Sequence, residues 1–208
     1  MSKFIKIAIV TVSIVAVVAG CSVLKQISQT IDNMKRLEFK LGNVSNFSLA
    51  GVSLVGKTKV SDLSISDALK LTNAFASKRL PAEFILDVDA RNPNDGTAQN
   101  SNSSASITNF EWRLIIDDTP TITGNIASPV TVPGKGQTTV IPLSVQVDLF
   151  EFFGNQGYDK LINLATAIGG AGNSARLKLD AKPTVKIGSI PITYPGRLTI
   201  VNHEFRDK

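Results

Sequence analysis

Cysteine and histidine are almost missing from this 208-residue sequence, which contains only Cys21 and His203. A single cysteine excludes an internal disulfide bond, and these two residues cannot supply the usual ligand set of a zinc site. His203 lies in a polar terminal segment, where a catalytic base would be poorly positioned, and no Gly-x-Ser-x-Gly motif is present. We therefore expect a protein without enzymatic activity, cofactor or metal.

Charged and aromatic side chains are also scarce. Aromatic residues make up 6% and charged residues 19% of the sequence, and the net charge is +5. Two of the basic residues, Lys3 and Lys6, belong to the N-terminal segment, and the others are scattered. Because nucleic-acid-binding domains concentrate basic residues on one face, we expect no nucleic-acid partner. The many valine, isoleucine and threonine residues instead predict a β-rich domain.

The N-terminus holds the longest apolar stretch. Residues 1–20 contain a short basic region, an apolar stretch over 7–18 and then two small residues. This layout is typical of a secretory signal peptide and is too short for a comfortable transmembrane helix. Its end, Val-Ala-Gly-Cys, resembles the lipobox of bacterial lipoproteins, in which the cysteine becomes the acylated N-terminus. We expect Cys21 to carry acyl chains such as palmitate and to anchor the chain in a membrane.

The alternative is an uncleaved membrane anchor with an incidental cysteine at position 21. The residue after Cys21 is Ser22. In Gram-negative lipoproteins an aspartate at this position is similar to a signal for retention in the inner membrane, and this chain has no aspartate there. For a Gram-negative source, we therefore expect the cell envelope, at the periplasmic face of the outer membrane rather than the inner membrane.

Alternating apolar residues predict strands through most of the remaining chain. The clearest runs are 81–91, 110–116 and 141–149. Pro142 interrupts the third run, which predicts a strand at a sheet edge or beside a bulge. Trp112 has apolar neighbours in register, so we expect it in the core rather than at a stacking site.

Glycines and helical spacing complete the predicted elements. Gly42 predicts a turn or bulge, and Gly51 predicts a bulge within a strand. Residues 66–79 and 157–168 have the apolar spacing of helices, and Ser66 is the predicted N-cap of the first. Each helix carries one apolar stripe, which favours packing on a sheet.

The strand Ile-Leu-Asp-Val-Asp-Ala-Arg over 85–91 ends in a turn formed by Asn92, Pro93 and Asn94. A Phe/Trp strand then ends in an Asp-Asp turn at 117–118, Val-Pro-Gly-Lys-Gly follows at 132–136, and Tyr-Pro-Gly stands at 194–196. This ordered set resembles the type 2 late embryogenesis abundant (LEA) proteins, also called WHy (water stress and hypersensitive response) domains. In that family the Asn-Pro-Asn turn is structural.

The resemblance implies an antiparallel fibronectin-III-like or immunoglobulin-like β-sandwich with one or two packed α-helices. It also implies a non-enzymatic role in tolerance to desiccation or other stress. We divide the chain into a signal peptide (1–20), a lipidated N-terminus and tether (21–35), a strand-and-helix extension (36–79) and a LEA type 2-like sandwich (80–208). The extension either adds strands to this sandwich or reaches toward the membrane.

Asp87 and Asp89 point from one face of a predicted strand. Two such carboxylates could act as acid and base or hold calcium. On the outer face of a strand, however, carboxylates at this spacing are ordinarily solvated residues.

The candidate binding patch is aromatic and consists of Phe150, Phe152, Phe153 and Tyr158. If the strand over 141–149 continued, Phe150 and Phe152 would lie on the face opposite Leu149. Helix 157–168 would then cover some of the rings, or they would stay exposed. The patch therefore predicts either helix-on-sheet packing or a site for a lipid or another apolar ligand. A further alternative is a subunit of an envelope complex that binds a protein partner at a strand edge.

Overall fold

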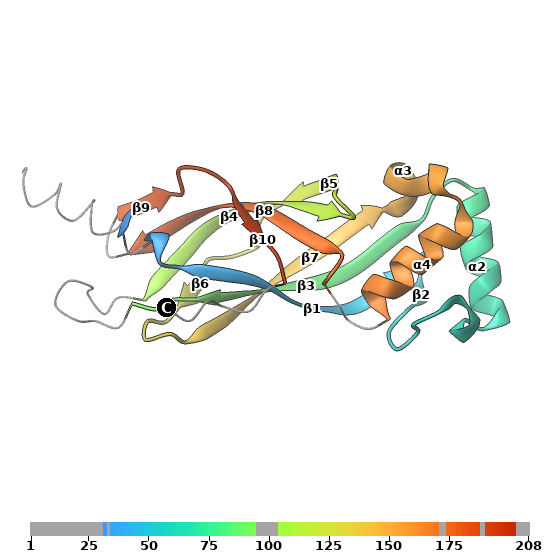
Figure 1. The fold of residues 1–208 in the computed structure, drawn as a ribbon, viewed down its shortest axis with the longest axis horizontal. Helices are drawn as coiled ribbons and strands as arrows, with labels where there is room; N and C mark the ends of the chain where they lie inside the picture. Colours follow the sequence, from blue (N-terminus) through green and yellow to red (C-terminus); the bar gives the residue numbers. More distant parts are fainter. Residues whose placement is uncertain (1–30, 33, 95–103, 171–173, 188–189, 203–208) are drawn as a thin grey trace, which may run out of the picture.

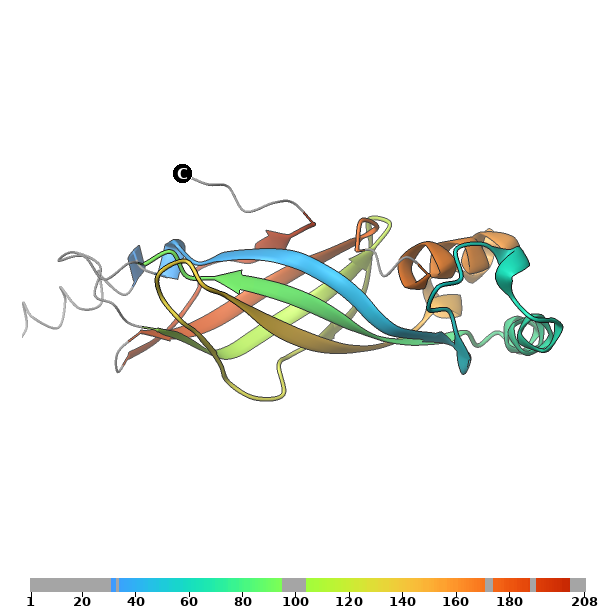
Figure 2. The same ribbon diagram turned by 90° about the horizontal axis from the view of Figure 1, so that it is seen from below.

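The computed structural model describes residues 31–32, 34–94, 104–170, 174–187 and 190–202. They form two antiparallel β-sheets that pack face to face, with three α-helices gathered at one end (Figures 1 and 2). The predicted β-sandwich with packed helices is thus confirmed, although it has three helices rather than one or two. Cys21, His203 and the signal-peptide segment lie outside the described residues.

The first sheet has the strand order β2 (Val52–Ser53), β1 (Glu38–Leu49), β3 (Pro81–Arg91) and β7 (Thr138–Asp148). The β3 strand pairs with β7 in one unbroken register, and its other edge pairs with β1. The predicted 36–79 extension therefore contributes β1 to the main sandwich. Because β7 is the last strand of this order, the edge position predicted from Pro142 is confirmed.

The second sheet has the order β10 (Leu198–Ile200), β8 (Leu177–Ile187), β4 (Ala105–Ile116) and β5 (Thr119–Gly124). Two short strands lie off this path: β6 (Val130–Val132) pairs with β4, and β9 (Ile190–Thr193) pairs with β8. The two sheets approach each other along one side, where the amide of Leu41 in β1 donates to the carbonyl of Val201 at 3.1 Å.

The core lies between the inner faces of the two sheets. In β3, Leu86 and Val88 are fully buried, and Leu114 and Ile116 of β4 are equally inaccessible. Trp112 is 4% exposed, which confirms its predicted place in the core. Burial of alternate residues explains why these strands were recognisable from the sequence.

The two glycines of β1 and its turn have different roles. The register between β1 and β3 shifts between Leu41 and Val44, so a bulge surrounds Gly42 as predicted. The prediction of a bulge at Gly51 is wrong, because Ala50 and Gly51 form the two-residue turn of the β1–β2 hairpin. Both have positive φ angles, 46° and 74°, which suit a hairpin turn that follows strand twist.

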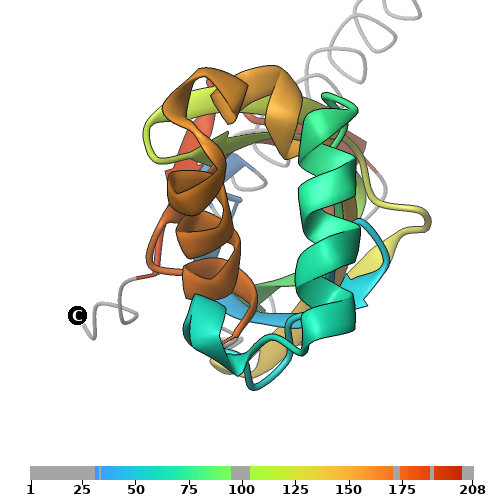
Figure 3. The same cartoon turned by 90° about the vertical axis from the view of Figure 1, so that its right-hand side faces the viewer.

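The helices are α2 (Ile65–Ala76), α3 (Leu149–Phe153) and α4 (Tyr158–Gly169). The short 3₁₀ helix η1 (Val60–Asp62) precedes α2, and a second one, η2 (Gly154–Gln156), joins α3 to α4. Figure 3 looks along the long axis and shows the helices around the end of the sandwich. We call this end, residues 55–79 and 149–169, the helical end.

Helix α4 holds the helical end to the sandwich through its buried face and its last residues. Leu161, Ile162, Ala165 and Ile168 are buried. After the helix, the carbonyl of Gly170 accepts from the amide of Gly56 at 3.1 Å, which fixes the chain that follows β2.

Candidate functional site

The aromatic patch predicted from the sequence lies at the helical end, with its rings distributed over two helices. Phe150, Phe152 and Phe153 belong to α3, and Tyr158 is the first residue of α4. Only Phe153 is fully buried, at 1% exposure, whereas the other three are half-buried. The chain therefore brings the four predicted residues into one region but does not join them into a single face.

The prediction that Phe150 and Phe152 alternate along a strand is wrong, because β7 stops at Asp148. The Asp148 side chain accepts hydrogen bonds from the amides of Leu80 at 2.8 Å and Phe150 at 3.0 Å. The second bond makes Asp148 the N-cap of α3. The turn into a helix moves the rings off the strand faces, and it brings the Phe150 ring against Phe75 of α2.

Phe75 of α2 covers part of the aromatic patch. Its ring meets those of Phe150 and Tyr158 edge-on, with centroids 5.2 Å and 5.5 Å apart. Edge-to-face packing at these distances is attractive, so Phe75 fastens α2 onto α3 and α4. In the patch, α2 therefore packs on α3 and α4. The sequence had suggested packing of a helix on a sheet instead.

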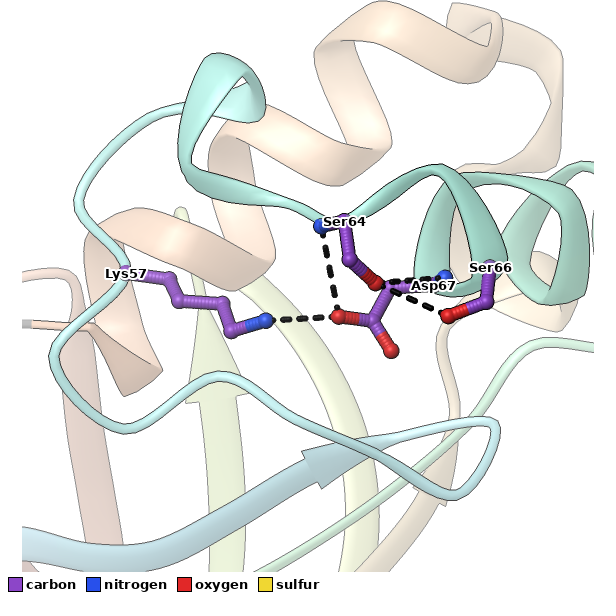
Figure 4. Close-up of polar contacts among 4 residues, drawn as sticks. All are labelled: Lys57, Ser64, Ser66 and Asp67. Atoms are coloured by element: carbon purple, nitrogen blue, oxygen red, sulfur yellow. Dashed lines mark hydrogen bonds and ion pairs between the residues drawn. The ribbon is translucent and has the colours of Figure 1, made fainter.

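The start of α2 is held by a small polar network (Figure 4). The N-cap is Ser64 rather than the predicted Ser66, because its hydroxyl accepts from the Asp67 amide at 3.1 Å. Lys57 Nζ reaches the Asp67 carboxylate at 2.7 Å. The hydrogen bond from Lys57, and after it the hydrogen bond with the Ser64 side chain, lower the pKa of the Asp67 carboxyl below its ordinary value of 3.8. The network ties the loop after β2 to the first turn of α2.

The Asn-Pro-Asn turn lies near the other end of β3 and is largely internal. Asn92 and Asn94 are 0% and 1% exposed. The Asn92 side-chain oxygen accepts from both the backbone amide and the side-chain amide of Asn94, at 3.2 and 2.7 Å. Their backbone carbonyls accept from the amides of Gly136 and Lys135 at 2.8 and 2.7 Å. The turn therefore fixes the end of β3 against the β6–β7 connection.

Asp87 and Asp89 lie on the outer face of β3, as predicted. Lys40 of β1 approaches Asp89 at 3.6 Å. Partial burial, and then repulsion by Asp89, raises the pKa of Asp87 above its ordinary value. Within the described part of the chain, no group of three or more metal-ligating side chains accompanies this pair.

Sequence reasoning missed an exposed apolar stripe on α2. Ile65 and Leu69 are 83% and 59% exposed, whereas Leu71 is fully buried and Ala74 and Phe75 pack against the core. The signal was present as an apolar pair four residues apart, but sequence spacing alone does not tell which stripe of a helix faces inward. None of the helices in the described residues is long and apolar enough to cross a membrane.

No family model and no curated protein matches this chain. Several solved structures resemble it distantly. The solution structure of a "putative late embryogenesis abundant (LEA) protein" shares 16% identity over 93% of this chain and 88% of that one, with a TM-score of 0.34. A crystal structure of an Archaeoglobus fulgidus protein shares 15% identity over 60% of this chain and 88% of that one, with a TM-score of 0.29. TM-scores this low carry no argument about function.

Proposed function

We propose that this chain is a lipid-anchored, non-catalytic protein of the cell envelope. It belongs to the LEA type 2-like class and helps the envelope to survive desiccation or related stress. The observation that carries the LEA-like part is the buried Asn92–Asn94 turn. A turn that the sequence resemblance treats as structural is built into the fold by side-chain and backbone bonds.

The proposed anchor is compatible with the position of β1. This strand begins with Glu38 at the end of the sandwich away from the helices (Figure 1). A lipid on Cys21 would then attach at that end and leave the helical end facing away from the anchoring membrane. Acylation by more than one chain would make such attachment stable.

The anchor is tested by replacing Cys21 with serine in the full-length chain. We expect loss of palmitate labelling, and release of the protein from membranes that are washed with high salt, because no other residue resembles an acylation site. The control is Ser22→Ala, which should keep its labelling and stay on the washed membranes. Palmitate labelling of the Cys21→Ser protein would disprove the anchor.

The stress role is tested in the source organism by deleting the gene and measuring survival after drying and rehydration. We expect lower survival, restored by the wild-type gene but not by Cys21→Ser. If the deletion strain survives as well as its parent over a range of drying times, the protective role is wrong.

A binding function for lipid or another apolar ligand is the second candidate. The specific observation in its favour is that Phe150, Phe152 and Tyr158 at the helical end keep part of their surfaces exposed. Native mass spectrometry of protein purified from its own cells would detect a bound lipid. We expect Phe150→Ala to lose the added mass and Val140→Ala, at an exposed position on β7, to retain it. Repeated absence of added mass from the wild-type protein would reject this candidate.

A further inference from the structure

Helix α2 presents apolar side chains to solvent at the far tip of the molecule. Its axis runs across the long axis, and it is the outermost element at the helical end (Figures 1 and 2). In Figure 2 it is seen end-on, whereas the strands run lengthwise. A flat surface that met this end of the molecule would therefore touch α2 along its length.

The exposed stripe follows from the helical period. With about 100° per residue, Ile65, Leu69, Thr72 and Ala76 fall on one stripe, which lies on the opposite side from buried Leu71. All four are exposed, and Ile65 and Leu69 are among the most exposed large apolar residues described. Because an outward apolar stripe gains nothing in the isolated protein, it suggests contact with a surface that removes it from water.

The side chains around this stripe carry a net positive charge, which favours contact with an anionic surface. Residues 55–79 contain five basic and two acidic side chains, a net charge of +3. Both acids are engaged locally, since the Asp62 carboxylate accepts from the amides of Thr58 and Lys59, and the Asp67 carboxylate accepts from Lys57 Nζ and the amide of Ser64. The neighbouring helices add Glu151, Asp159 and Lys160, so the helical end keeps a net charge of +2.

Four cations of this segment remain available to a partner. These are Lys59, Lys70, Lys78 and Arg79, which are exposed and make no ion pair with the residues that the structure describes. Lys70 lies on α2, about 100° around the helix from Leu69, and Lys78 and Arg79 follow the C-terminal end of the helix. Exposed apolar side chains accompanied by basic ones are the composition of helices that lie in the interface of an anionic bilayer.

We propose that α2 is a membrane-surface contact that inserts Ile65 and Leu69 between the headgroups of a bilayer containing anionic phospholipid, with the surrounding cations on the phosphates. This contact is independent of the proposed anchor at Cys21. If both exist, they lie at opposite ends of the sandwich, and one molecule bridges two bilayer surfaces.

Vesicle capture tests the contact with the full-length protein. The protein is reconstituted into phosphatidylcholine donor vesicles, and labelled acceptor vesicles contain about 30% phosphatidylglycerol. We expect capture of these acceptors but not of pure phosphatidylcholine acceptors. Capture should fall about fivefold for Lys70→Glu, and high salt should weaken it because the charges are screened.

The apolar contribution is tested by a double variant, Ile65→Ser with Leu69→Ser, which should reduce capture about tenfold or more. The matched controls lie on the strands: Val140→Ser replaces an exposed apolar residue of β7, and Lys186→Glu replaces an exposed cation of β8. Both controls should capture acceptors normally. Because Ile65 and Leu69 are exposed, the double variant should melt at the wild-type temperature.

The experiment distinguishes loss of the Cys21 anchor from loss of the α2 membrane contact. A protein that leaves the donor vesicles has no stable anchor, and the same variants are then sedimented directly with the acceptors, with the same order of binding expected. Equal capture by the wild type and the double variant would overturn the proposal. So would absence of acceptor capture combined with cross-linking between copies that requires Leu69, since the stripe would then cover a second copy of the chain.

Discussion

Gly169, the last residue of α4, lies directly against the ring of Phe47 in β1. A Cβ added to Gly169 would stand 2.4 Å from Cγ of Phe47, and Phe47 is only 1% exposed. Phe47 also stacks on Phe84, with ring centroids 5.1 Å apart, so it has little room to move. The absence of a side chain at Gly169 therefore lets the end of α4 pack directly against β1.

Replacing Gly169 with alanine should lower the free energy of unfolding by about 1–3 kcal/mol, the usual cost of overpacking a core. Urea unfolding followed by circular dichroism measures this change. Gly196→Ala is the matched control, because a Cβ there meets nothing within 4 Å. Equal stability of the two variants would show that the Phe47 ring can move aside at little cost, and it would contradict the prediction.

Gly124 makes a similar close approach to Trp112, the only tryptophan in the chain. These two residues are paired across β5 and β4, and a Cβ on Gly124 would lie 2.2 Å from Cζ2 of the indole. We expect Gly124→Ala to displace the indole and lower the free energy of unfolding by about 1–3 kcal/mol. The native fluorescence spectrum reports the displacement, and an unchanged spectrum and stability would contradict it.

Asn92→Ala should destabilise the protein by about 1–3 kcal/mol, because it removes a buried acceptor for both amide groups of Asn94. Thermal unfolding measures the loss. Asn73→Ala, at an exposed position of α2, is the control and should change stability little. A loss at Asn92 no larger than that at Asn73 would contradict a structural role for the turn.

The long alternating strands were predictable because one buried face imposes a period of two on β3, β4 and β7. The short helix α3 was not, because it depends on Asp148, whose carboxylate is shared with the amide of Leu80, 68 residues away. No local sequence pattern predicts a contact between residues so far apart in the chain. The outward stripe of α2 was missed for a related reason, since only tertiary packing selects which of two apolar stripes is buried.

Asp67 should make the protein less stable in acid. Its pKa is lowered in the folded state, chiefly by Lys57, so its contribution exists above the ordinary value of 3.8 and is lost as the pH falls through the folded pKa. Asp67→Asn should therefore be less stable than the wild type at pH 7 and approach it in strong acid. Denaturant titrations across this range measure the difference, and a constant difference would contradict the assignment.

Asp87 should behave in the opposite way. Burial and Asp89 raise its pKa in the folded state, so its ionisation costs stability as the pH rises through the folded pKa. Asp87→Asn should be more stable than the wild type at pH 7, and the two should converge below about pH 3.8. Asp118→Asn, at an 80% exposed side chain, is the control. A less stable Asp87→Asn protein at neutral pH would reject the prediction.

The course of β1 has a mechanical consequence. The strand starts at the end away from the helices, runs the length of the first sheet and is bonded to β3 through most of that length (Figure 1). A force applied to its first residue acts along the strand, so the hydrogen bonds of the ladder bear the load together instead of opening one after another. The fold is suited to being held under tension from its N-terminal side without losing its first strand.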